Sequence, residues 1–158
     1  MQAVLAIDAP VLVLGYGNSG RQDDGLGCAA AEAIADLGLA GVRTSAKYQL
    51  AIDDAYDASE CAAVIFVDAS KSAAAPFSVE PVVASTEPAF FASHDVRPEF
   101  ILSLCRRVYG CSPDARVIGI RGYAFGFDEG LTAPARENLD AAVAYIRGVL
   151  HGRDACAS

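Results

Sequence analysis

The fold is decided by residues 11–28, which read VLVLGYGNSGRQDDGLGC. This stretch begins with four apolar residues, Val11 to Leu14, as is typical of a parallel strand that is covered on both faces. Three glycines interrupt the strand, and two carboxylates, Asp23 and Asp24, then precede an alanine-rich segment. We therefore expect a strand, a sharp turn and a helix, with any ligand bound where the strand ends.

The composition indicates one compact domain. The chain has 158 residues, of which 53% are hydrophobic and 20% charged, so we expect a single domain over 1–158 with a core at 11–150 and tails at 1–10 and 151–158. The net charge of −8 disfavours nucleic acid as a partner, because binding a polyanion needs clustered Lys and Arg. The first ten residues lack the features of a signal peptide, and no apolar run reaches the length of about 18 residues that a membrane span needs. We expect a cytoplasmic protein without membrane insertion.

The rest of the chain alternates between strand and helix patterns. Expected strands lie at 11–14, 42–48, 62–68, 77–83 and 116–120, and expected helices at 25–37, 52–60, 98–109 and 134–150. The strand at 77–83 is the one that we expect to run antiparallel. This alternation predicts an α/β fold, a three-layer α/β/α sandwich with a mostly parallel twisted sheet of about five strands and helices on both faces.

Three side chains are expected to meet at one edge of that sheet. Ligands of such folds bind beyond the carboxyl ends of the strands. Asp24 follows the first strand, Asp68 ends the strand at 62–68, and His94 lies in a polar loop that can return to the same edge. Carboxylate and imidazole ligands with open positions suit a divalent cation such as nickel, zinc or cobalt. The alternatives that remain open are a helix cap for Asp23 or Asp24, loop hydrogen bonds for Asp68 and a solvated His94.

The glycine loop also fits a nucleotide-binding pattern. Gly15 to Gly20 matches G-x-G-x-x-G after a strand. Asp23 and Asp24, however, stand where the helix N-terminus would receive a phosphate, and would repel it. Residues 46–48 also supply no acid for a ribose. A nucleotide-binding domain is therefore the less favoured alternative, and we expect no organic cofactor.

Four separated motifs resemble one protein family. GYGNSGRQDDGLG, VIFVDAS, SHDVRPEF and FGFDEGL occur in the order and at the spacing found in the hydrogenase maturation endopeptidases, which trim the large subunit of [NiFe] hydrogenases. The resemblance covers the chain from Val11 to about Leu150. It implies that Asp24, Asp68 and His94 are the nickel-binding and catalytic residues, with Asp23 as the second choice for the first ligand.

The resemblance also implies a reaction. The enzyme would remove the C-terminal extension of a [NiFe] hydrogenase large subunit precursor after nickel insertion, and the substrate would contribute the nickel. A non-catalytic chaperone that binds nickel or the precursor is the alternative from another class. A thiol nucleophile is disfavoured, because Cys28 and Cys105 are expected inside helices. Tyr123, Phe125 and Phe127 are expected to be buried under the sheet edge, with a substrate-facing patch as the alternative.

Overall fold

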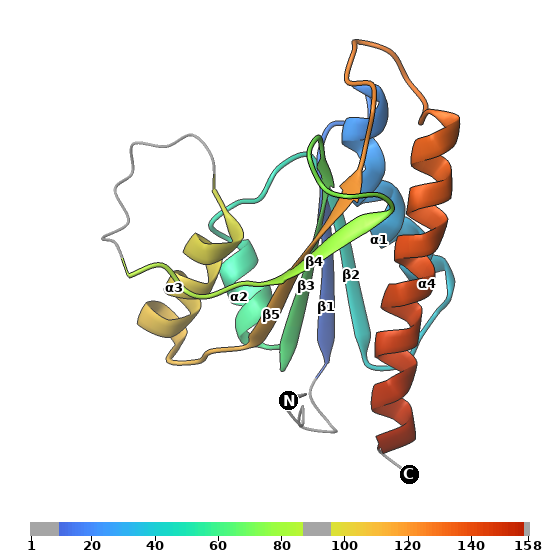
Figure 1. The fold of residues 1–158 in the computed structure, drawn as a ribbon. Helices are drawn as coiled ribbons and strands as arrows, with labels where there is room; N and C mark the ends of the chain where they lie inside the picture. Colours follow the sequence, from blue (N-terminus) through green and yellow to red (C-terminus); the bar gives the residue numbers. More distant parts are fainter. Residues whose placement is uncertain (1–9, 87–95, 157–158) are drawn as a thin grey trace.

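The computed structural model describes residues 10–86 and 96–156. In this part of the chain five strands form one sheet in the order β2-β1-β3-β5-β4 (Figure 1). The four strands that run parallel are β1 (Val11–Tyr16), β2 (Val42–Lys47), β3 (Ala63–Ser70) and β5 (Asp114–Arg121). The edge strand β4 (Phe77–Pro81) runs antiparallel to β5. The predicted sheet and its one antiparallel strand are confirmed.

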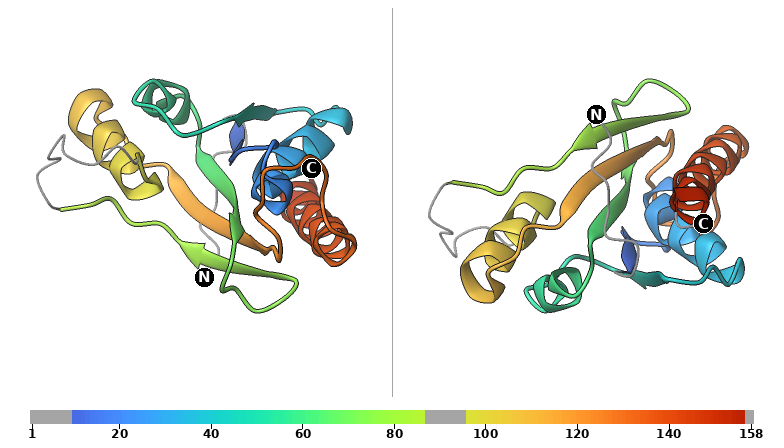
Figure 2. Two further views of the ribbon diagram at one scale, coloured as in Figure 1. Left: turned by 90° about the horizontal axis from the view of Figure 1, so that it is seen from above. Right: turned by 90° about the horizontal axis from the view of Figure 1, so that it is seen from below.

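Helices cover both faces of the sheet. Helices α1 (Leu26–Asp36) and α4 (Ala133–Cys156) lie on one face, and α2 (Asp54–Ser59) and α3 (Pro98–Tyr109) lie on the other (Figure 2). Each face has its own hydrophobic core. The predicted three-layer α/β/α sandwich is confirmed.

Side chains alternate between these two cores along β1 and β3. Val13 and Val67 pack on the α1 and α4 side, whereas Leu14 and Phe66 pack on the α2 and α3 side. Because side chains alternate with a period of two, the residues two positions after Leu14 and Phe66 also point to the α2 and α3 side.

The glycines of the first loop bring β1 and α1 into close backbone contact. A Cβ atom added to Gly15 would meet the carbonyl oxygen of Gly27, and one added to Gly27 would meet the carbonyl oxygens of Tyr16 and Val67. Gly17 has a φ of +142°, a conformation that favours glycine. Helix packing and a tight turn therefore account for these glycines without a bound phosphate.

Some element boundaries differ from the predictions. A short 3-10 helix, η1 (Gln22–Gly25), precedes α1, and β3 continues past Asp68 to Ser70. Helix α4 runs past Leu150 to Cys156, so the predicted end of this helix at Leu150 is wrong. This segment contains no proline, and a glycine in a helix costs only about 1 kcal/mol relative to alanine. Among the described helices, none is both long and apolar enough to cross a membrane.

Candidate functional site

The topology brings Asp24 and Asp68 to the same edge of the sheet. Strand β1 lies between β2 and β3, so the connections leaving β1 and β3 diverge at their carboxyl ends. In open α/β sheets this divergence creates a crevice where ligands bind. Asp24 belongs to η1, which follows the loop after β1, and Asp68 lies near the carboxyl end of β3.

Within residues 10–86 and 96–156, each of the two carboxylates has one oxygen that accepts no hydrogen bond. The backbone N–H of Asn18 donates to Asp24 Oδ2 at 2.9 Å, and that of Ala69 donates to Asp68 Oδ1 at 2.8 Å. Among the residues that the structure describes, no other hydrogen bond and no ion pair reaches either carboxylate. Asp24 Oδ1 and Asp68 Oδ2 are thus available to a ligand.

The electrostatics of this edge favour a cation. The pKa of Asp68 is raised to about 6, because burial and the negative charge of Asp24 raise it more than the hydrogen bond from Ala69 lowers it. Burial also raises the pKa of Tyr16, together with the charges of Asp68 and Glu99. A divalent cation held between two carboxylates relieves their repulsion.

Asp23 has a different environment from its neighbour. Its side chain is fully buried, and its carboxylate accepts hydrogen bonds from the backbone N–H groups of Tyr123, Ala124 and Thr132 at 2.8, 3.0 and 2.8 Å. The Thr132 hydroxyl donates a fourth bond at 2.9 Å. Burial raises the pKa of Asp23, but these hydrogen bonds more than offset it, and the pKa is lowered. An ionised carboxylate offers about four acceptor sites, and Asp23 uses four of them to hold the loop after β5. Neither of its oxygens is therefore left for a metal ion.

The third candidate ligand, His94, lies outside the described residues. Within residues 10–86 and 96–156, no group of three His, Cys, Asp or Glu side chains is placed to hold a metal ion. The three-ligand site therefore stays a prediction, and the structure describes the two carboxylates only.

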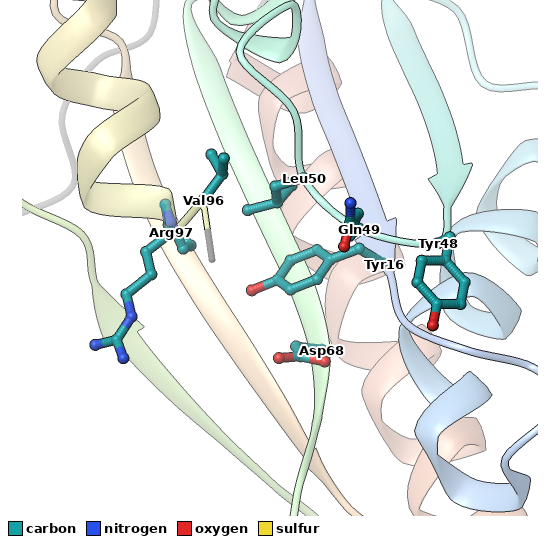
Figure 3. A pocket seen from close by; sticks show the side chains of 8 residues that line it. Tyr16, Tyr48, Gln49, Leu50, Asp68, Val96 and Arg97 are labelled. Atoms are coloured by element: carbon teal, nitrogen blue, oxygen red, sulfur yellow. The ribbon is translucent and has the colours of Figure 1, made fainter. Parts of the chain in front are cut away.

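A cavity of about 250 Å³ opens beside Asp68 (Figure 3). Its lining comes from the carboxyl ends of β1, β2 and β3 and from the start of α3, and consists of Tyr16, Tyr48, Gln49, Leu50, Asp68, Val96, Arg97 and Pro98. Tyr16 and Arg97 are not among the site residues predicted from the sequence. The signal for Tyr16 was available, because the strand alternation from Leu14 points its side chain to the same side as Asp68.

The aromatic loop after β5 is more exposed than predicted. Phe127 is 92% exposed and Tyr123 is 46% exposed, so the predicted burial is wrong for these two residues. The guanidinium carbon of Arg21 lies 5.1 Å from the centre of the Phe127 ring. A cation that stacks on an aromatic face stabilises the ring at the surface.

The cysteines of the described core are buried thiols. Cys28 and Cys105 are buried, and burial raises the pKa of both thiols. The Cys28 thiol contacts the carbonyl oxygen of Lys47 at 3.3 Å. Because the thiolate is the nucleophilic form, neither residue suits covalent catalysis, in agreement with the prediction.

Solved structures of hydrogenase maturation proteases match this chain along most of its length. HycI from Thermococcus kodakarensis KOD1 matches with a TM-score of 0.72 and 19% identity, over 94% of this chain and 96% of its own. HybD from E. coli matches with a TM-score of 0.71 and 20% identity, over 90% and 93%. The hydrogenase 2 maturation peptidase from Thaumarchaeota archaeon SCGC_AB-539-E09 matches with a TM-score of 0.68 and 19% identity, over 90% and 98%.

No protein-family model and no curated protein matches this sequence. The matches to solved structures establish the fold. The chain therefore has the fold of the [NiFe] hydrogenase maturation proteases, which confirms the fold that the sequence resemblance implied.

Proposed function

We propose that this chain is an endopeptidase that removes the C-terminal extension of a [NiFe] hydrogenase large subunit precursor after nickel insertion. The observation that carries the proposal is the pair of carboxylates, Asp24 and Asp68, with free oxygens at the edge where β1 and β3 end. This edge belongs to a fold shared with solved maturation proteases along nearly the whole chain. Membership of that family, a cytoplasmic location and the precursor as partner are parts of the same proposal.

Nickel enters this proposal as part of the substrate. Asp24 Oδ1 and Asp68 Oδ2 supply two oxygen ligands, and we assign His94 as a nitrogen ligand. The assignment of His94 is supported by Val96, which follows it by two positions and lines the cavity beside Asp68. Mixed oxygen and nitrogen ligation suits nickel, and three ligands leave positions for groups of the precursor.

The reaction is the hydrolysis of one peptide bond. The oxygen of a water molecule bonds to the carbonyl carbon, the C–N bond breaks, and a proton of the water passes to the leaving amine. A metal ion at such a site polarises the carbonyl or activates the water. Asp24, Asp68 and His94 would place the precursor so that its scissile bond lies at the edge of the sheet.

Two observations weigh against the nucleotide-binding alternative. Gly15 is explained by its close backbone contact with α1, and Gly17 by its positive φ. Asp23 and Asp24 also lie in η1, where a phosphate would have to bind. We expect no rise in melting temperature when NAD or ATP is added, whereas a shift of several degrees would support that alternative.

A turnover experiment separates the endopeptidase from a non-catalytic chaperone. The protein is mixed with a molar excess of nickel-loaded precursor, and the shortened large subunit is quantified over time by mass spectrometry. Product in excess of the protein supports the endopeptidase. Stoichiometric binding without shortening would support the chaperone.

A further inference from the structure

The side chain of Tyr16 lies beside Asp68 on the neighbouring strand. Strands β1 and β3 are parallel, with Gly15 opposite Val67, so the next residues, Tyr16 and Asp68, are level with each other. Both follow the alternation of Leu14 and Phe66 and point to the α2 and α3 side of the sheet.

The Tyr16 hydroxyl faces the cavity and not the core. Its ring packs against the core on the α2 and α3 side, and its hydroxyl extends into the space beside the Asp68 carboxylate (Figure 3). Within residues 10–86 and 96–156 this hydroxyl has no hydrogen-bond partner. At about 30 Å³ for one water molecule, a cavity of about 250 Å³ has room for a peptide group and a side chain.

Two other polar side chains of the lining, Arg97 and Tyr48, are placed differently. The side chain of Arg97 extends away from Tyr16 and Asp68, and the Tyr48 hydroxyl points away from the Asp68 carboxylate (Figure 3). Tyr48 is also 66% exposed. The Tyr16 phenol is therefore a neutral hydrogen-bond donor placed next to the Asp68 carboxylate at the inner side of the cavity.

We propose that Tyr16 is a catalytic residue whose hydroxyl donates a hydrogen bond to the carbonyl oxygen of the scissile peptide bond. This inference rests on the proposed endopeptidase function and adds a residue to it. The carbonyl oxygen gains negative charge when water adds to the carbonyl carbon, so a donor fixed at that oxygen stabilises the transition state more than the ground state. A phenol, with an ordinary pKa near 10, keeps its proton at neutral pH, whereas an ionised carboxylate has none to donate.

The test is the Tyr16→Phe variant, which removes one oxygen atom and keeps the ring that packs in the core. The substrate is a nickel-loaded [NiFe] hydrogenase large subunit precursor that the wild-type protein shortens. We expect kcat to fall by roughly 100-fold, as for the loss of one oxyanion donor in other enzymes. KM, the Kd for the precursor and the melting temperature should stay close to those of the wild type. Tyr56→Phe is the matched control, because it removes a phenol from the exposed surface of α2, outside the lining of the cavity, and it should leave kcat unchanged.

The outcomes distinguish this inference from the proposed function. If the wild type shortens no nickel-loaded precursor, the proposed function fails before Tyr16 is tested. If the wild type is active and Tyr16→Phe keeps its kcat, the inference is wrong while the function stands. A rise in KM or Kd at constant kcat would also overturn it, because the hydroxyl would then contribute to binding only. A loss of kcat with a lowered melting temperature is resolved by circular dichroism at the assay temperature: an unfolded variant overturns the assignment, and a folded one supports it.

Discussion

Replacing Asp23 by asparagine should destabilise the fold, whereas the same replacement at the neighbouring Asp24 should change the stability much less. The Asp23 carboxylate accepts four hydrogen bonds in a fully buried position. In Asp23→Asn one oxygen becomes an NH2 group, which faces a donor such as the backbone N–H of Thr132. A buried donor without an acceptor costs about 1–3 kcal/mol, and the bonds that remain lose their charge assistance. The free energy of unfolding should therefore fall by about 2–4 kcal/mol.

The measurement is urea unfolding at pH 7, followed by circular dichroism. Asp24→Asn is the matched control, because Asp24 is only partly buried and accepts a single backbone hydrogen bond; its change should stay below about 1 kcal/mol. If Asp23→Asn were as stable as the wild type to within about 0.5 kcal/mol, the structural role of Asp23 would be refuted, and its position as a ligand would have to be reconsidered.

The same variant has a characteristic pH dependence. The pKa of Asp23 is lowered in the folded protein, below its unfolded value of about 3.9. Its stabilisation is therefore fully present above about pH 4 and is lost as the pH falls through the folded-state pKa. The difference in unfolding free energy between the wild type and Asp23→Asn should narrow below pH 4, and a difference that widens there would contradict this account.

Three further predictions concern the site and the helix contact. Asp24→Asn and Asp68→Asn should each lower precursor cleavage by about 100-fold or more, since loss of even an outer partner of a metal site costs 10- to 100-fold; full activity in either would refute its ligand role. His94→Ala should also lower precursor cleavage by about 100-fold or more, with an unchanged circular dichroism spectrum. Cleavage at the wild-type rate would refute the ligand role of His94. Gly27→Ala should destabilise the protein by about 1–3 kcal/mol or more, because the added Cβ would meet backbone oxygens. Gly148→Ala in α4 places its Cβ in open space and should stabilise the protein by about 0.5–1 kcal/mol. A higher melting temperature for Gly27→Ala than for Gly148→Ala would contradict the packing of α1 on β1.

The layers of the fold follow from patterns that are local in the sequence. Continuous apolar runs at 11–14 and 62–68 indicated strands that are covered on both faces, and β1 and β3 are buried in this way. The predicted end of α4 at Leu150 was wrong. The residues after Leu150 are polar, and a polar segment can be either a tail or the last turns of a helix.

The site was only partly predictable, because its decisive contacts join residues far apart in the chain. The order of strands could place Asp24 and Asp68 at one edge, but it could not tell Asp24 from Asp23. That distinction depends on hydrogen bonds between Asp23 and Thr132, separated by 109 positions. The contact of Arg21 with the ring of Phe127 likewise joins residues that are far apart in the chain.

The central claim is tested most directly by the intact mass of a [NiFe] hydrogenase large subunit precursor after incubation with this protein, measured in parallel for nickel-loaded and nickel-free precursor. We expect the nickel-loaded precursor to lose its C-terminal extension in a single cut, while the nickel-free precursor keeps its full mass. An unchanged mass for a matched, nickel-loaded precursor would contradict the endopeptidase function. Equal shortening of both forms would contradict the recognition of nickel through Asp24, Asp68 and His94.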